Sequence, residues 1–406
     1  MINVDSTIQS PASLSSRAAA ELLGVKTQTL YAYASRGLLR RVGEGKRRRY
    51  LLEDVERLRT RQRARSGHGP VAAAALSFGE PVLDTNVTGI DQRGPLYRGR
   101  PAVELAASGS HFESVAELLW TGELPETAPP WQALPAPARG WGPARTSLED
   151  LMLALPALAQ AAPTRHSRAR HVELALARRL LRSLALLLVP PQARREGGSV
   201  AALLSNGCKV PPTEARHALD LALVLLADHE LNASSFAARI AASTDANLLA
   251  CLTAALATLS GPRHGGACDR IEALLDEAAG LPRPERVLEM RNRRGDLVPG
   301  FGHPVYPHGD PRAQSLLACA GALSQRSAAL KKRLAPALVL AKAMQREGLP
   351  ATVDFGLVAL TRTLGMRQGS AALLFALGRS AGWVAHVLEQ RQSEVVLRPR
   401  ARYLGA

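Results

Sequence analysis

The chain has 406 residues, of which 46% are hydrophobic and 4% aromatic, and it carries a formal net charge of +16. This length can hold one large domain and one small domain, and the apolar share is enough for a sizeable core. The four cysteines lie far apart, without a CxxC pair or a Cys/His ligand spacing, which argues against a disulfide framework and a metal site. Ala and Leu dominate the composition, and runs of β-branched residues are scarce. This composition predicts an all-α fold.

The sequence also bounds the compartment. The N-terminus does not show the basic and then apolar order of a signal peptide. No uninterrupted apolar run reaches the ~18 residues that suggest a membrane span. We therefore expect a soluble, cytoplasmic protein with no membrane partner.

Residues 1–65 are predicted to form a small separate domain. Ser15 and Ser16 are suited to cap a helix over 17–23, and a turn at Gly24 leads to a second helix over 27–36. A glycine-containing hairpin follows, and a third helix starts at Leu52. Between residues 36 and 65 there are twelve Lys and Arg against four Asp and Glu, a net +8, which is half of the charge of the chain.

This domain resembles the winged helix-turn-helix of mercury-resistance-type (MerR) regulators over roughly 50 residues, in line with the size of such motifs. A basic wing and an exposed second helix suit contacts to phosphates and a DNA groove. The alternative is a docking or dimerising module whose charges are simply solvated. The residues predicted to contact duplex DNA are Gln28, Tyr31, Lys46, Arg47, Arg48 and Arg49.

Residues 66–75 have the composition of a linker, and the second domain is predicted over 76–406. It starts with a short hairpin over 90–98, followed by helical patterns over 102–107 and 112–120. The segment 125–215 is rich in Ala, Pro and Leu, and it contains no chemical motif.

The stretch 228–266 carries the first candidate site residues. His229 lies between two carboxylates, and His264 is followed by two glycines, which let a backbone or a ligand approach its ring. A helix is predicted to begin near Asp269, so His264 precedes a helix N-terminus, where partial positive charge disfavours imidazolium. A neutral imidazole there can donate a hydrogen bond to a carbonyl oxygen that gains charge.

Further candidates follow toward the C-terminus. His303 lies in a glycine-flanked turn, and the guanidinium of Arg312 is suited to hold a carboxylate through two hydrogen bonds. Asp354 stands in an apolar setting just before an apolar helix, where burial raises the pKa of a carboxyl toward the range of a general base. Arg379 is an isolated charge in a helix of small residues, and Arg398 lies near the C-terminus. Together these residues could supply a general acid, a general base and several groups that bind carboxylates.

Residues from about Asp84 to Gly405 resemble the citrate synthase family. The motifs that carry the resemblance, in chain order, are GIDQRGPLYRGRPAVELA, DHELNASSFAAR, SGPRHGGA, GFGHPVY with GDPRA, VDF, FALGRSAGWVAH and RPRARYLG. The resemblance implies an all-α homodimer with a large and a small subdomain per subunit, the small one over roughly 266–352. The active site would lie between them and be shared between subunits.

The resemblance also implies roles for the candidate residues. Asp354 would remove a proton from the methyl group of acetyl-CoA, His264 would stabilise the enolate, and His303 would polarise the ketone of oxaloacetate. The resulting citryl-CoA would then be hydrolysed. The oxaloacetate carboxylates would be held by His229, His303, Arg312, Arg379 and Arg398, the last from the partner subunit. No cofactor is implied, because acetyl-CoA is a co-substrate.

Three positions depart from the family pattern. Pro304 and Pro307 stand in a segment where many relatives have a basic residue that can contact the coenzyme A phosphates. The sequence therefore does not predict which residues would make those contacts here. Cys268 replaces a frequent asparagine, and Gly356 begins a segment that differs from the usual Tyr-Ser-Gly. We therefore expect the core chemistry of a citrate synthase, with 2-methylcitrate synthesis from propionyl-CoA as a close variant. The alternative from another class is a DNA-binding regulator that senses oxaloacetate or an acyl-CoA.

Overall fold

A computed structural model describes residues 13–35, 39, 41–42, 49–51, 54–55, 58, 83–136, 144, 147–194, 197–393 and 395–399. The chain divides into two compact units, one of residues 1–84 with 400–406 and one of residues 85–399. The predicted boundaries at 65 and 75 fall in a segment outside the described residues, and they stay predictions.

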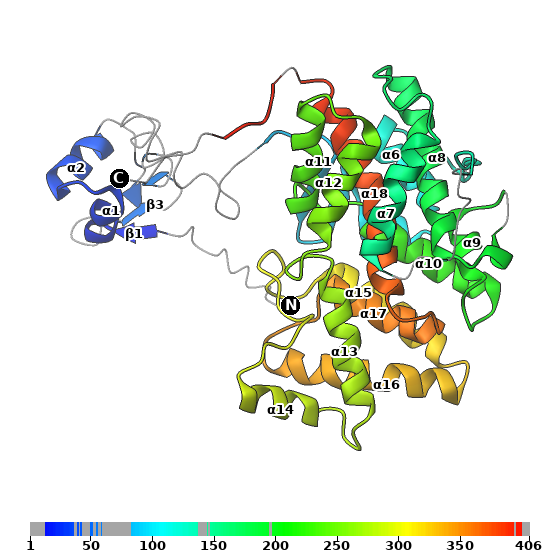
Figure 1. The fold of residues 1–406 in the computed structure, drawn as a ribbon. Coiled ribbons are helices and arrows are strands. Elements are labelled where there is room, and N and C mark those ends of the chain that lie inside the picture. Colours follow the sequence, from blue (N-terminus) through cyan, green and yellow to red (C-terminus); the bar gives the residue numbers. More distant parts are fainter. Residues whose placement is uncertain are drawn as a thin grey trace, which may run out of the picture. The chain divides into compact units, whose positions relative to one another are not determined.

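The described part of the first unit contains the short helices α1 and α2 and a three-stranded sheet, and Asp54, Val55 and Leu58 are also helical, in the region of the third predicted helix (Figure 1). Helix α1 spans Ser16–Leu23 and α2 spans Thr27–Ser35. Ser15 caps α1 by accepting a hydrogen bond from the Ala18 N–H, as the sequence predicts. The sheet has the order β1-β3-β2 with antiparallel pairs, so the predicted hairpin pairing is confirmed. Its strands are β1 (Ser13–Ser15), β2 (Arg41–Val42) and β3 (Arg49–Leu51).

The second unit is almost entirely helical, which confirms the all-α prediction. It opens with a small antiparallel sheet of β4 (Thr88–Asp91), β5 (Gly94–Tyr97) and β6 (Arg100–Pro101). The described helices are α5 (Ala102–Ala107), α6 (Phe112–Thr121), α7 (Leu148–Gln160), α8 (Arg170–Leu188), η2 (Pro191–Ala193), α9 (Val200–Ser205), α10 (Pro212–Leu226), α11 (Ala233–Ser243), α12 (Leu248–Leu259), α13 (Ala267–Ala279), α14 (Arg286–Arg294), α15 (Pro311–Ser324), α16 (Ala328–Arg346), α17 (Val353–Leu364) and α18 (Ser370–Gln390).

Helix α18 forms the centre of this unit. It contacts α6, α7, α8, α10, α11, α12, α13 and α17, and Figure 1 shows it running between the helices of the upper part of the unit. Within the described ranges it is the one helix long and apolar enough to cross a membrane, but its apolar window is wholly buried inside the fold. Arg379 and His386 interrupt the apolar run, which is why inspection of the sequence did not single it out.

Tight turns place the candidate residues at helix ends. His229 follows α10, and Asn232 caps α11 by accepting hydrogen bonds from two backbone N–H groups. A Cβ on Gly265 would lie 2.7 Å from the Leu259 side chain, and one on Gly266 would lie 2.6 Å from the Ser260 carbonyl oxygen. The C-terminal end of α12 therefore packs closely against the two glycines that follow His264, which is possible because they have no Cβ.

Candidate active site

Three aromatic side chains from two distant segments meet in the second unit. The His229 and His303 rings are 5.8 Å apart between centroids and nearly perpendicular. The Tyr306 ring lies 5.5 Å from His229 and 5.3 Å from His303. The Tyr306 hydroxyl and His229 Nε2 are 2.8 Å apart, a hydrogen-bond distance. The fold thus brings together two of the histidines predicted from the sequence.

His303 has a defined tautomer when neutral. Its Nδ1 accepts a hydrogen bond from the Val305 N–H at 3.1 Å. A neutral imidazole that accepts at one ring nitrogen carries its proton on the other, so His303 presents an Nε2–H donor. Burial and the nearby charge of Arg312 lower the pKa of His303, which keeps the ring neutral.

Arg312 is held by an aspartate within its own motif. Its Nε and Nη2 donate to Asp310 Oδ1 and Oδ2 at 3.0 and 2.8 Å, and both residues are 1% exposed. The two-bonded carboxylate contact expected for Arg312 is therefore made with Asp310. Arg312 Nη1 is buried and makes no hydrogen bond within the described part of the chain. One arm of the guanidinium thus has its hydrogens available to an anion.

Arg379 approaches the same region from α18. It is buried, its Nε donates to the Leu226 carbonyl at 2.9 Å, and its guanidinium lies over the Phe375 ring at 4.9 Å. The burial of His229 lowers the pKa of its imidazole well below the ordinary value, and the charges of Arg312 and Arg379 lower it further. The histidine among these cations is neutral, and the cations provide an environment that favours an anionic ligand.

His264 is anchored by a serine. Its Nε2 lies 2.9 Å from Ser234 Oγ, which also accepts a hydrogen bond from the Trp383 indole N–H at 3.1 Å. Nδ1 is therefore the nitrogen left for a substrate. Burial and then the charge of Arg379 lower the pKa of His264 to about 4. The predicted neutral imidazole is confirmed, but burial is its main cause, whereas the sequence pointed to the helix end.

Asp354 is in the first turn of α17, not before the helix as the sequence suggested. Burial raises the pKa of its carboxyl above the ordinary value, and the charge of Arg312 partly opposes that rise. The Cys268 thiol points its sulfur at Asp354 Oδ1 at 3.8 Å, and burial keeps the pKa of this thiol high, so it remains a donor. Cys268 lies four residues after His264, in the first turn of α13, so the contact connects the segment of His264 with the carboxylate.

Arg398 does not join this group within one chain. It is exposed in segment 395–399, which has no regular secondary structure, and no hydrogen bond or ion pair to the residues above is found among the described residues. The predicted DNA contacts belong to the other unit. Gln28 and Tyr31 are exposed on α2, and Arg49 is exposed on β3. Lys46, Arg47 and Arg48 lie outside the described residues.

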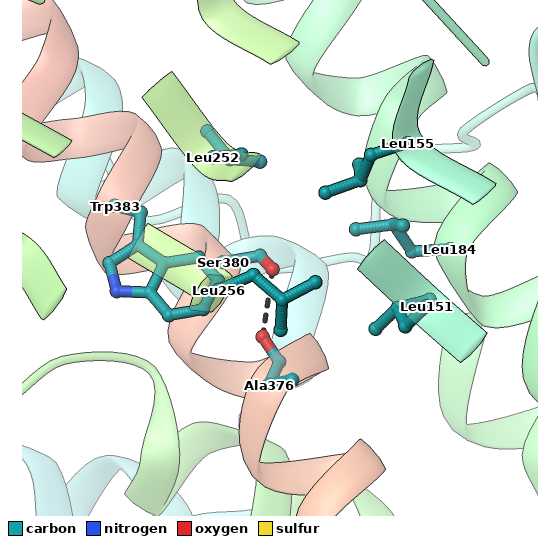
Figure 2. Close-up of a pocket in the computed structure, with 8 residues that line it drawn as sticks. All are labelled: Leu151, Leu155, Leu184, Leu252, Leu256, Ala376, Ser380 and Trp383. Atoms are coloured by element: carbon teal, nitrogen blue, oxygen red, sulfur yellow. Dashed lines mark hydrogen bonds between the residues drawn. The ribbon is translucent and has the colours of Figure 1, made fainter. Parts of the chain in front are cut away.

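A small apolar cavity lies beside α18, which contributes Ala376, Ser380 and Trp383 to its lining (Figure 2). Trp383 lines it and also reaches Ser234 through its indole N–H. The Ser380 hydroxyl donates to the Ala376 carbonyl at 2.7 Å, as the dashed line in Figure 2 shows. The remaining lining residues are Leu151, Leu155, Leu184, Leu252 and Leu256. None of the predicted site residues lines the cavity, so it is a feature of core packing.

Sequence reasoning did not assign functions to Ser234, Tyr306 or Asp310. Each of them contacts one of the predicted site residues, which lies either far away in the sequence or in the same turn. A motif read along the sequence does not reveal such contacts. Asp310 did carry a signal, because an acidic residue ahead of a helix beginning with proline is a common N-cap. It accepts from the Arg312 N–H as the cap of α15.

Comparisons with known proteins agree with this arrangement. Residues 77–400 match the family described as citrate synthase, C-terminal domain, and residues 13–63 match a helix-turn-helix domain. A relative named citrate synthase 2 from Bacillus subtilis is 34% identical over 54% of this chain. That alignment spans 59% of the relative's length. A 2-methylcitrate synthase from Shewanella oneidensis is 29% identical over 81% of this chain and 93% of its own length.

A solved structure shares the fold. It is a ternary complex of carboxymethyl coenzyme A and oxaloacetate with a citrate synthase from Thermoplasma acidophilum. The TM-score is 0.69 at 27% identity, over 81% of this chain and 95% of that one.

Proposed function

Because the chain belongs to the citrate synthase family, we propose that it condenses acetyl-CoA with oxaloacetate to give citrate and free coenzyme A. The observation that carries this proposal is the meeting of neutral histidines, buried arginines and a carboxyl of raised pKa in one unit. Two cations with neutral donors suit a dicarboxylate, and a weak carbon acid needs a base and an oxyanion donor.

The first step is removal of a proton from the acetyl-CoA methyl group by Asp354. The raised pKa of this carboxyl makes it a stronger base than an ordinary aspartate. His264 stabilises the enolate oxygen by donating from Nδ1, and in this step the Ser234 hydroxyl turns its hydrogen from Asn232 Oδ1 to His264 Nε2 to hold that tautomer. The neutral state of His264 matters, because the ring then acts as a donor without first losing a proton.

The enolate carbon next attacks the ketone carbon of oxaloacetate. His303 donates a hydrogen bond from its Nε2–H to the ketone oxygen, which polarises the carbonyl and stabilises the alkoxide as it forms. The alkoxide then takes a proton from water, to which Asp354 returns the proton that it removed. Arg312, Arg379 and His229 hold the carboxylates, and Arg398 joins them from a second subunit. Water then attacks the thioester of citryl-CoA, which releases citrate and the thiol of coenzyme A. No further cofactor takes part.

A thiol-release assay tests the proposal directly. Full-length protein with oxaloacetate and acetyl-CoA is expected to liberate coenzyme A thiol, and each substrate alone is expected to liberate none. The same assay with propionyl-CoA tests the close variant, 2-methylcitrate synthesis, which the Shewanella relative favours. Absence of thiol release with both acyl-CoA substrates would refute catalysis and leave the regulator hypothesis. We also propose that the reaction takes place in the cytoplasm, in the tricarboxylic acid cycle when the acyl group is acetyl.

The shared site of a homodimer gives a prediction for Arg398. Arg398→Ala is expected to weaken oxaloacetate binding, because a buried or half-buried substrate carboxylate left without its partner costs about 2–5 kcal/mol. Mixing Arg398→Ala subunits with Asp354→Asn subunits should restore part of the thiol-release rate, since one of the two mixed sites then has both residues intact. If subunit exchange is verified and the rate does not recover, each site is built within one chain.

A second candidate function rests on the helix-turn-helix domain over residues 13–63. Gln28 and Tyr31 are exposed on α2, as a helix that reads DNA requires. Two such domains on one homodimer would favour a palindromic or repeated DNA site. The competing hypothesis is that this domain gates the synthase activity and binds no DNA.

Deletion of residues 1–70 separates the two hypotheses. We expect the full-length chain to bind duplex DNA with a strong dependence on salt. We expect the truncated protein to remain active and to lose that binding. Each neutralised phosphate lowers log K by about 0.9 per unit of log salt concentration. Changing Lys46, Arg47, Arg48 and Arg49 to Ala together should flatten that slope in an anisotropy titration. Equal DNA affinity of both forms, with altered turnover after truncation, would favour gating instead.

A further inference from the structure

Tyr306 has no role in the mechanism above, yet it lies within the group of substrate-binding side chains. Its side chain is 5% exposed, and the sole hydrogen-bond partner of its hydroxyl among the described residues is His229, at 2.8 Å. The same ring lies beside His303. A buried phenol usually needs one polar partner for its hydroxyl, and this one has a partner that is itself a candidate ligand of the substrate.

Cations and neutral donors lie near the hydroxyl, and so do the carboxylates of Asp310 and Glu230. The Arg312 guanidinium carbon is 5.5 Å from the centroid of the Tyr306 ring, and Arg312 Nη1 has no partner within the described residues. Burial raises the pKa of Tyr306 to about 12, so the phenol keeps its proton at neutral pH. Together with neutral His229 and His303, this is a set of groups that can all donate to one anion.

The chain also restrains the position of this hydroxyl. His303 and Tyr306 each precede a proline, and a following proline restricts the backbone of both residues. The Tyr306 N–H donates to the His303 carbonyl at 3.0 Å, so the two side chains belong to one closed turn. Pro304 and Pro307 stand where the family pattern has a basic residue, which suggests that this turn serves to place His303 and Tyr306.

We propose that Tyr306 contacts the substrate, donating a hydrogen bond from its hydroxyl to an oxaloacetate carboxylate, which His229 then holds through the Tyr306 hydroxyl and not directly. This proposal rests on the proposed function. In the free protein the phenol O–H donates to Nε2 of neutral His229. A carboxylate is a stronger acceptor than an imidazole nitrogen, so the phenol hydrogen turns to the substrate. His229 then takes its other neutral tautomer and donates from Nε2 to the phenol oxygen, and no net proton is transferred.

Tyr306→Phe tests the proposal, because it removes one hydroxyl and keeps the ring that packs beside the histidines. Oxaloacetate binding to the full-length chain is measured by calorimetry. The dissociation constant should rise on the order of 10- to 100-fold, the range for loss of a hydrogen bond to a charged group. The KM for oxaloacetate should rise by a similar factor, while the KM for acetyl-CoA changes little. Succinate, which has both carboxylates and no ketone, should lose affinity by the same factor.

Ser324→Ala is the matched control, since it removes a buried hydroxyl that donates only to the Gly321 carbonyl at the other end of α15. It should leave oxaloacetate binding unchanged. A Tyr306→Phe dissociation constant within about twofold of wild type, or tighter, overturns the proposal, because the expected loss is tenfold or more. Loss with oxaloacetate alone overturns the carboxylate assignment and points to the ketone. If the wild type binds no oxaloacetate, the proposed function fails and the role of Tyr306 falls with it.

Discussion

Asp354→Asn is expected to abolish turnover while oxaloacetate still binds. The carboxamide keeps the shape of the side chain but cannot accept the methyl proton at neutral pH. General-base catalysis contributes about 10²–10⁴-fold, so kcat should fall by at least that order. Thiol release gives kcat, and calorimetry gives the oxaloacetate dissociation constant. In the wild type, kcat/KM should fall as the pH drops through the raised pKa of Asp354, because the protonated carboxyl is no longer a base.

Asp245→Asn is the control for this change, because the Asp245 side chain is 88% exposed and lies at a surface turn. The substitution makes the same chemical change outside the site, and it should leave the rate of thiol release unaltered. A rate for Asp354→Asn within about threefold of wild type, far from the range of a general base, would remove Asp354 from the mechanism.

Asp310→Ala should lower the free energy of unfolding more than any other substitution named above. Asp310 pairs with Arg312 through two hydrogen bonds, caps α15, and accepts from the Val353 N–H at 3.2 Å at the start of α17. Removing one partner of a buried ion pair costs about 3–5 kcal/mol, because the other charge stays buried without compensation. Loss of the cap adds about 1 kcal/mol. The free energy of unfolding is measured by denaturant titration at fixed protein concentration.

Glu214→Ala is the comparison for this substitution. It breaks the Arg326–Glu214 pair, whose side chains are 55% and 26% exposed. Pairs of this kind contribute about 0–1 kcal/mol, so the unfolding midpoint should move little. Equal shifts in the two variants would show that the Asp310–Arg312 pair is no more important to stability than a surface contact. Asp310→Asn, which keeps the side-chain shape and can still cap the helix, should fall between the two.

Local chemistry in the sequence was enough for much of the fold and for most of the candidate site. The Ala- and Leu-rich patterns predicted helices, and α5 has the bounds that the sequence indicated. The glycines after His264 signalled a close approach, and the apolar setting of Asp354 signalled a raised pKa, because both effects depend on neighbours in the chain. The family motifs then placed His229, His303, Arg312 and Arg379 in one site.

Tertiary structure decided which group each of these side chains contacts. The sequence allowed Arg312 to hold a substrate carboxylate with two hydrogen bonds, but in the fold Asp310 takes both and leaves only Nη1. His264 is neutral mainly because it is buried, and its ring is anchored by Ser234, which lies 30 residues earlier in the chain. Tyr306 reaches His229 across 77 residues. Hydrogen-bond partners and desolvation depend on distances in space, and a linear pattern records only distances along the chain.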